Sequence, residues 1–276
     1  MSSVPQVTLN NGVTIPQLGF GVFQIPGDET ERAVSAALEA GYRLIDTAAA
    51  YGNEEEVGRA VAASGLPRHE IFITTKLWND AHGYDKTLEA FDQSRTRLGL
   101  DTVDLHLIHW PTPARDDYVE TWEAMAKIYA DGGARAIGVS NFNVEHLERL
   151  AAETDLVPAV NQVELHPGLA QSRLRAYHGE HGIVTEAWSP IGQGQGVLDE
   201  PVVAKVAEAH GVSPAQAVLR WHIQLGNVTI PKSVRPERIR SNIDVFGFEL
   251  TAGEMEELTA LGEDRRLGPD PARFNA

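Results

Sequence analysis

The sequence of 276 residues contains no cysteine. This absence excludes disulfide bonds, metal sites with thiolate ligands and cysteine nucleophiles. The sequence also lacks an apolar run long enough to span a bilayer, and residues 1–5 carry neither the basic nor the apolar region of a signal peptide. We therefore expect a cytoplasmic protein with no membrane partner.

Positive charge is scarce, because 23 Lys and Arg face 39 Asp and Glu and leave a net charge of −16 at pH 7. This balance argues against a nucleic-acid partner. One basic cluster interrupts it, formed by Lys232, Arg235, Arg238 and Arg240. The cluster is either a solvated helix face balanced by Glu237 or a site for an anion.

The chain has no linker or low-complexity tract, so we expect residues 1–276 to form one domain. Residues 7–15 predict a hairpin that turns at Asn10-Asn11-Gly12. Short apolar runs then alternate with amphipathic segments eight times, and residues 252–261 predict a final helix. The apolar runs are residues 18–21, 43–46, 71–76, 103–109, 135–139, 159–164, 184–188 and 228–230. The amphipathic segments, which predict helices, are residues 30–40, 54–63, 84–98, 118–131, 144–152, 172–181, 202–210 with 214–224, and 236–245.

Strict alternation of strands and helices predicts a parallel sheet with right-handed crossovers. Eight units fit a closed (β/α)8 TIM barrel, here with an N-terminal β-hairpin and an extra C-terminal helix. A doubly wound open sheet is the competing architecture. Its GxGxxG fingerprint is missing, because Gly19-Phe20-Gly21 continues as Val22-Phe23-Gln24.

Polar and aromatic residues recur where the predicted strands end, and barrel active sites lie at that end of the strands. Each such residue alone could be a cap or a turn residue, but together they predict one pocket. They are Asp46, Lys76, Trp78, His109, Trp110, Ser140, Asn141, Gln162, Glu164, Trp188, Ser189, Lys232 and Ser233.

Four of the residues near strand ends make a set that could donate a proton: Asp46, Tyr51, Lys76 and His109. The ammonium of Lys76 would lower the pKa of the Tyr51 phenol, and Asp46 would keep that ammonium charged. His109 would orient the phenol or relay its proton. Structural roles stay open for all four, as a cap, a loop packer, a surface cation and a core histidine.

Other chemistry is possible for the same side chains. Lys76 could form a Schiff base, although a cation kept beside a carboxylate is a poor nucleophile. We expect no metal site, because His106 and His109 point to opposite faces of a strand. His178 and His181 could share a helical face, but no third ligand accompanies them, so we expect them to be surface histidines.

A second group of residues suits a dinucleotide. The Trp188 ring could stack on a planar ring, and the amides of Asn141 and Gln162 suit a carboxamide. The glycines of residues 191–196 allow a backbone approach to phosphate. Residues 230–233 lead into a helix whose start favours an anion, and Arg238 and Asn242 on that helix would suit a 2′-phosphorylated dinucleotide.

Residues 41–58, 71–78 and 230–242 carry a resemblance that extends over the whole chain. In these stretches, and in residues 107–111, 137–142 and 161–164, the sequence resembles the aldo-keto reductases. It is most similar to the prokaryotic 2,5-diketo-D-gluconate reductases.

The resemblance implies NADPH-dependent reduction of a small carbonyl substrate. Tyr51 would be the general acid, Lys76 and Asp46 would tune it, and His109 would orient the carbonyl. The cofactor-binding residues implied are Ser140, Asn141 and Gln162 at the carboxamide, Trp188 with its neighbour Ser189 at the nicotinamide, Lys232, Ser233 and Arg238 at the 2′-phosphate, and Asn242 near the adenine. Phe23, Trp78 and Trp110 would wall the substrate pocket.

Two departures from the family bear on specificity. The segment from Trp110 to about Tyr118 and the tail after Leu261 are both short, which suggests an open mouth with loose selectivity. Arg273 in the tail could favour acidic or polyhydroxy substrates. We expect a monomer; the alternative function is an NADPH-binding regulatory subunit with little turnover.

Overall fold

The computed structural model describes residues 4–276. Residues 1–3, on which part of the signal-peptide argument depends, lie outside the described residues. Eight parallel strands form one sheet, and each strand pairs with the next one along the chain. They are β3 (Phe20–Gly21), β4 (Leu44–Asp46), β5 (Phe72–Leu77), β6 (Val103–Ile108), β7 (Ala134–Ser140), β8 (Val160–Glu164), β9 (Val184–Trp188) and β10 (Val228–Thr229).

The first and last strands of this sheet meet. Leu18, just before β3, forms a parallel bridge with Thr229 of β10. The Gly19 amide donates to the carbonyl of Thr229, whose own amide donates to the carbonyl of Gln17. The sheet therefore closes, which confirms the predicted (β/α)8 barrel and excludes the doubly wound open sheet.

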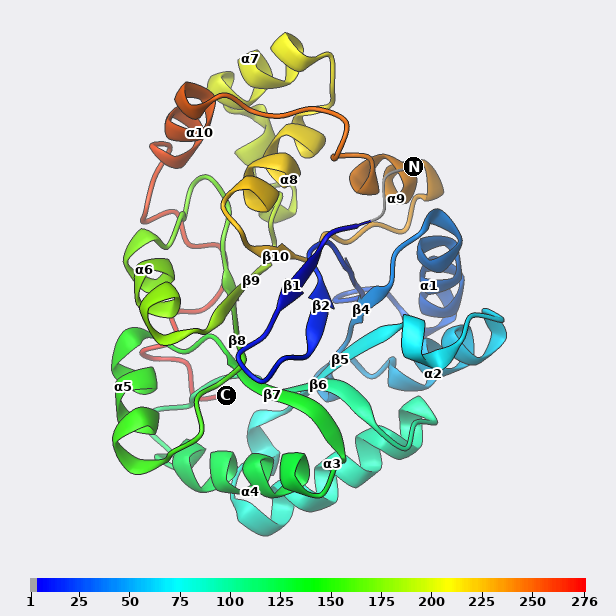
Figure 1. Ribbon diagram of the computed structural model, residues 1–276, viewed down its shortest axis with the longest axis vertical. Helices are drawn as coiled ribbons and strands as arrows, with labels where there is room; N and C mark the ends of the chain where they lie inside the picture. Colours follow the sequence, from blue (N-terminus) through cyan, green and yellow to red (C-terminus); the bar gives the residue numbers. More distant parts are fainter. Residues whose placement is uncertain (1–3) are drawn as a thin grey trace.

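Helices surround the barrel in the predicted alternation (Figure 1). The predicted bounds of α2, α3, α6, α8 and β9 match the structure residue for residue. No helix within residues 4–276 is both long and apolar enough to span a membrane. The helices are α1 (Gly27–Ala40), α2 (Glu54–Ala63), α3 (Tyr84–Leu98), α4 (Tyr118–Ala130), α5 (Val144–Glu153), α6 (Ser172–His181), α7 (Pro201–His210), α8 (Pro214–Gln224), α9 (Pro236–Ile243) and α10 (Ala252–Thr259).

The predicted hairpin, β1 (Gln6–Thr8) and β2 (Thr14–Pro16), lies across the barrel (Figure 1). Its Leu9 and Ile15 are buried in one cluster with side chains of the barrel interior. The side chain of Asn10 donates to the carbonyls of Val157 and Pro158, just before β8 begins. The hairpin therefore closes the amino end of the barrel and leaves the carboxyl ends of the strands for a site.

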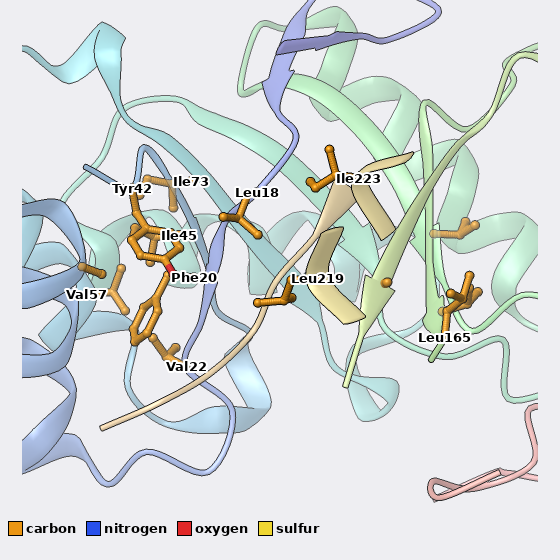
Figure 2. Close-up of a cluster of buried hydrophobic side chains, with 14 of the residues drawn as sticks. Leu18, Phe20, Val22, Tyr42, Ile45, Val57, Ile73, Leu165, Leu219 and Ile223 are labelled. Atoms are coloured by element: carbon orange, nitrogen blue, oxygen red, sulfur yellow. The ribbon is translucent and has the colours of Figure 1, made fainter. Parts of the chain in front are cut away.

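Alternate residues of each strand face two different environments. Ile45 of β4 and Ile73 of β5 lie in the apolar layer between strands and helices, where Phe20 and Tyr42 pack with ring centroids 5.7 Å apart (Figure 2). Because successive side chains point to opposite faces of a strand, Asp46 points into the barrel. Packing of the outer layer thus fixes which polar groups face inward.

Candidate active site

Asp46, Lys76 and Tyr51 meet at the carboxyl end of the barrel. The Lys76 Nζ donates to Asp46 Oδ1 at 2.6 Å, to the carbonyl of Thr47 at 3.0 Å and to Tyr51 Oη at 3.4 Å. Asp46 is 2% exposed and Lys76 is fully buried. The structural alternatives for these two residues, a cap and a surface cation, are therefore wrong.

The ion pair is formed by neighbouring strands in register. Asp46 of β4 pairs with Thr74 of β5, and Lys76 follows Thr74 by two residues on the same face. Tyr51 reaches the pair from the short 3₁₀ helix η1 (Ala49–Tyr51), directly after β4. The sequence therefore fixes this triad locally, through one strand pair and one loop.

Burial and charge act against each other in this triad. Burial lowers the pKa of Lys76, but Asp46 and Tyr51 outweigh it and hold the pKa above the ordinary value. Burial raises the pKa of Tyr51, and Lys76 offsets only part of that rise. The prediction that Lys76 leaves the phenol with a lowered pKa is therefore wrong in its net direction, although Lys76 acts in the direction expected.

His109 lies directly after β6 and is almost fully buried. Its ring faces Tyr51 and Trp78, with centroid distances of 5.7 and 5.1 Å. Burial, and then the charge of Lys76, lower the pKa of His109 well below its usual range. His109 is thus a neutral imidazole beside the phenol, suited to a hydrogen bond rather than to service as a cationic acid.

The predicted carboxamide residues are joined to one another. The Ser140 hydroxyl donates to the carbonyl of Gln162 at 2.8 Å, and the Asn141 amide donates to the carbonyl of His109 at 3.0 Å. The indole nitrogen of Trp188 donates to Asn141 Oδ1 at 2.8 Å. Ser189 directly follows Trp188 and accepts a hydrogen bond from the side chain of Gln193. The ends of β7, β8 and β9 therefore form one connected polar surface.

The basic cluster is exposed to solvent at the start of α9. Within residues 4–276, Lys232, Arg235 and Arg238 form no ion pair with Glu237 or with any other carboxylate. Ser233 is buried and accepts a hydrogen bond from the Arg235 amide at 3.1 Å. Positive charge without a protein partner in a chain of net charge −16 fits an anion such as a phosphate.

The glycine-rich segment forms the turn η4 (Gly192–Gly194), in which the first and last residues have positive φ values of 71° and 73°. Arg265 holds the end of this loop, because it donates to Glu200 at 2.7 Å and to the carbonyl of Gln195. Among the described residues, no group of three or more His, Asp or Glu is placed to hold a metal ion.

A family model described as the aldo/keto reductase family matches residues 17–263. The chain belongs to the aldo/keto reductase family. This membership confirms the resemblance at the level of the family and makes the protein an oxidoreductase.

Relatives of this aldo/keto reductase match it over nearly their whole length. An aldo-keto reductase of Mycolicibacterium smegmatis is 59% identical over 271 residues, 98% of each chain. The glyoxal reductase of Bacillus subtilis is 52% identical over 266 residues, 96% of this chain and 95% of the relative. A solved structure of a Gox0644 mutant in complex with NADPH is 47% identical and covers 98% of both chains, with a TM-score of 0.94. The closer likeness to 2,5-diketo-D-gluconate reductases stays a prediction.

Aromatic rings surround Tyr51 and His109 in this reductase. Phe23, which is 46% exposed, packs on Tyr51 with centroids 5.0 Å apart. Trp110 is buried and packs against Phe274 of the carboxyl tail, with ring centroids 4.5 Å apart. The structure thus brings the three predicted wall residues, Phe23, Trp78 and Trp110, near the triad and adds Phe274 to them.

The tail of the reductase is fixed to the strand ends. The amides of Leu267 and Gly268 donate to the two carboxylate oxygens of Glu164, at 2.6 and 2.9 Å. Asn275 accepts from the amide of Ala114 in the loop after β6, at 2.8 Å. The side chain of Arg273 is 88% exposed and lies 3.8 Å from Asp270. Sequence reasoning missed Phe274, because a lone aromatic in an aperiodic tail carries no pattern.

Two further residues differ from expectation. His178 is 1% exposed and bonds to Asn161 and Thr185, both at strands of the barrel wall, so the prediction of a surface histidine is wrong. Glu186 of β9 is fully buried beside the ion pair and was not predicted at all. Its signal was a lone carboxyl two positions before the strand end, which also fits a half-exposed strand.

Proposed function

We propose that this protein is an NADPH-dependent reductase of aldehydes and ketones, α-dicarbonyls and keto-sugars included, with Tyr51 as the proton donor. The observation that carries the proposal is the fully buried Lys76–Asp46 pair directly behind the Tyr51 hydroxyl. A relative named glyoxal reductase and the NADPH complex of Gox0644 support the substrate class and the cofactor. We further propose that residues 1–276 act as one catalytic domain, as a monomer in the cytoplasm.

The residues present fit the cofactor. Lys232, Ser233 and Arg238 would hold the 2′-phosphate, because this cluster has no carboxylate partner among the described residues. Asn242 on the same helix would lie near the adenine. Ser140, Asn141, Gln162, Trp188 and Ser189 would hold the nicotinamide end. When bound, the reduced nicotinamide supplies a hydride to the carbonyl carbon.

Tyr51 then gives its proton to the carbonyl oxygen. A raised pKa keeps the phenol protonated near neutral pH, so the donor is present before the substrate arrives. Lys76 reduces the cost of the phenolate that is left, because its ammonium lies 3.4 Å from the phenol oxygen. His109, as a neutral ring, can donate an N–H to the same carbonyl oxygen and so orient it.

Replacing Tyr51 by phenylalanine tests the assignment. We expect kcat with glyoxal, a keto-sugar and a simple aldehyde to fall by about 10²–10⁴-fold while NADPH affinity is kept. Loss of NADPH absorbance measures turnover. Tyr177→Phe on α6 is the matched control, because the Tyr177 hydroxyl makes no hydrogen bond within residues 4–276. An unchanged kcat in Tyr51→Phe refutes the assigned acid, and wild-type protein that binds NADPH without turnover favours the regulatory subunit.

A further inference from the structure

Glu186 joins the buried ion pair from the far side of the barrel. The residue is on β9, in register with Gln162 of β8, and it is fully buried. The Gln162 amide nitrogen donates to Asp46 Oδ2 at 2.8 Å and to Glu186 Oε2 at 3.0 Å. Two carboxyl groups from opposite walls therefore share one amide.

We propose that Glu186 is a positioning residue of this reductase, which together with Asp46 holds the Gln162 amide in one orientation and acts through it on the Lys76–Tyr51 pair. The inference rests on the proposed function, since it concerns the surface that receives the nicotinamide.

The orientation follows from the hydrogen-bond inventory. The Asp46 carboxylate, paired with Lys76, can only accept, so the NH₂ end of Gln162 faces it, and the same nitrogen donates to Oε2 of Glu186. Its oxygen then points away from both, and no residue of the described chain donates to it. Removing Glu186 leaves one anchor, and the terminal torsion of glutamine is broad without a second one. Glu186 thus helps to hold the Gln162 oxygen where it can accept a hydrogen bond from the NH₂ group of a carboxamide.

The charge balance follows from burial. Two carboxylates and one ammonium would leave a net negative charge in the barrel interior, which is costly. Burial, and then Asp46, raise the pKa of Glu186 to about 8, against the opposing effects of Gln162 and Lys76. Glu186 therefore keeps its proton at neutral pH while Asp46 pairs with Lys76.

Ionisation of Glu186 would weaken the acid. The charged and titratable groups that face it are Asp46, Lys76 and Tyr51, and a negative charge on Glu186 raises the pKa of both Tyr51 and Lys76. A phenol with a higher pKa is a poorer proton donor. Retention of the Glu186 proton thus extends the pH range over which Tyr51 works.

Two substitutions separate orientation from charge. Glu186→Gln keeps an acceptor for Gln162 but cannot ionise, so we expect NADPH affinity like that of the wild type. It should retain a larger share of its neutral-pH kcat at about pH 9 than the wild type does, by about threefold or more. Glu186→Met removes the acceptor, and we expect the Kd for NADPH, from quenching of tryptophan fluorescence without carbonyl, to rise about tenfold.

Infrared spectroscopy of the protein without cofactor supplies a readout that needs no turnover. We expect the wild type near pH 6 to show the carbonyl stretch of a protonated carboxyl group, which disappears as pH rises and is missing in Glu186→Gln. Glu54→Gln is the matched control, because Glu54 is also buried but is paired with Arg97 at 2.6 Å outside the barrel, so the band should stay.

Each of these measurements can overturn the proposed role of Glu186. Absence of the band in the wild type, or unchanged NADPH affinity in a folded Glu186→Met protein, overturns the proposal. A Glu186→Gln protein with the wild-type pH profile also overturns it, since a purely structural role would alter only the Tm. Failure of the proposed function can be told apart from failure of this proposal. If Tyr51→Phe keeps its turnover, Tyr51 is not the proton donor, but the infrared titration of Glu186 is unchanged.

Discussion

Replacing Asp46 by asparagine removes the charge that compensates a fully buried ammonium. Asp46 uses both oxygens, one for Lys76 and one for Gln162. Asparagine has a single oxygen, so its NH₂ group must face either the ammonium or the donating amide of Gln162. In either orientation every remaining hydrogen-bond partner of Lys76 is a neutral oxygen, those of Thr47 and Tyr51 included.

Breaking a buried ion pair by removal of one partner costs about 3–5 kcal/mol. At about 2–4 °C per kcal/mol for a chain of this size, the Tm should fall by roughly 6–20 °C. The proton donor should also weaken, because an uncompensated lysine in this position tends to lose its charge. We therefore expect kcat to fall together with the Tm. The double variant Asp46→Asn, Glu186→Gln should be less stable still, because Glu186 is the other carboxyl group that could ionise beside Lys76.

The pH dependence of the loss identifies its cause. In the wild type the pKa of Lys76 is raised, so its contribution to stability is present below the unfolded pKa and is lost only as pH rises through the folded one. In Asp46→Asn burial would lower that pKa, the unfolded chain would bind more protons, and stability would rise with pH. The deficit in the free energy of unfolding should therefore be larger at about pH 7 than at about pH 9.5 in urea titrations. Equal deficits, or a deficit below about 1 kcal/mol, would refute a charged lysine held by Asp46.

Two further predictions concern the cofactor and acid stability. Arg238→Ala should raise the KM for NADPH about tenfold or more and barely change the KM for NADH. The control variant, Arg240→Ala, should change neither KM much. Equal effects of Arg238→Ala on the two cofactors would rule out a role of Arg238 at the 2′-phosphate. Burial lowers the pKa of His106 to about 4 and those of His178 and His222 to about 3, so stability is lost as pH falls below the unfolded value of 6.5. Each of these histidines should lower the free energy of unfolding by about 2 kcal/mol between about pH 7 and about pH 5, because it binds a proton only in the unfolded chain. A urea midpoint that did not fall over that range would contradict burial of the three histidines in their neutral form.

The sequence predicted the barrel because local signals agreed with the topology. Helix α8 shows this, since Ser213 and Gln216 form a capping box and Pro214 occupies the first helical position. The predicted range of 214–224 matches the structure. Strand ends were predicted less well than helices: β10 ends at Thr229 rather than Ile230, because Thr229 is the last residue in register with β9.

The triad and His109 could be predicted because a parallel barrel brings the carboxyl ends of β4, β5 and β6 to one side. The direction of the Tyr51 pKa shift could not be predicted. It depends on how far the rise caused by burial exceeds the fall caused by Lys76, and the degree of burial is a property of the packed molecule. The contact of Phe274 with Trp110 joins residues 164 positions apart without any periodic pattern. Glu186 escaped prediction for a similar reason: only the register of β9 with β8 places it against Gln162.

Two strand ends with left-handed backbone conformation belong to the polar surface that we propose for the nicotinamide. Asn141 after β7 and Ser189 after β9 have φ values of 64° and 51°, a left-handed region that costs non-glycine residues free energy. At Asn141 the cost is offset locally, because its side chain bonds to the carbonyl of His109, to Ser140 and to the indole of Trp188. The same turn therefore links the residue beside the acid to the ring that would lie against the nicotinamide. Because these polar groups are already held by one another, little ordering would remain when the carboxamide of the cofactor binds, and such preorganisation strengthens binding.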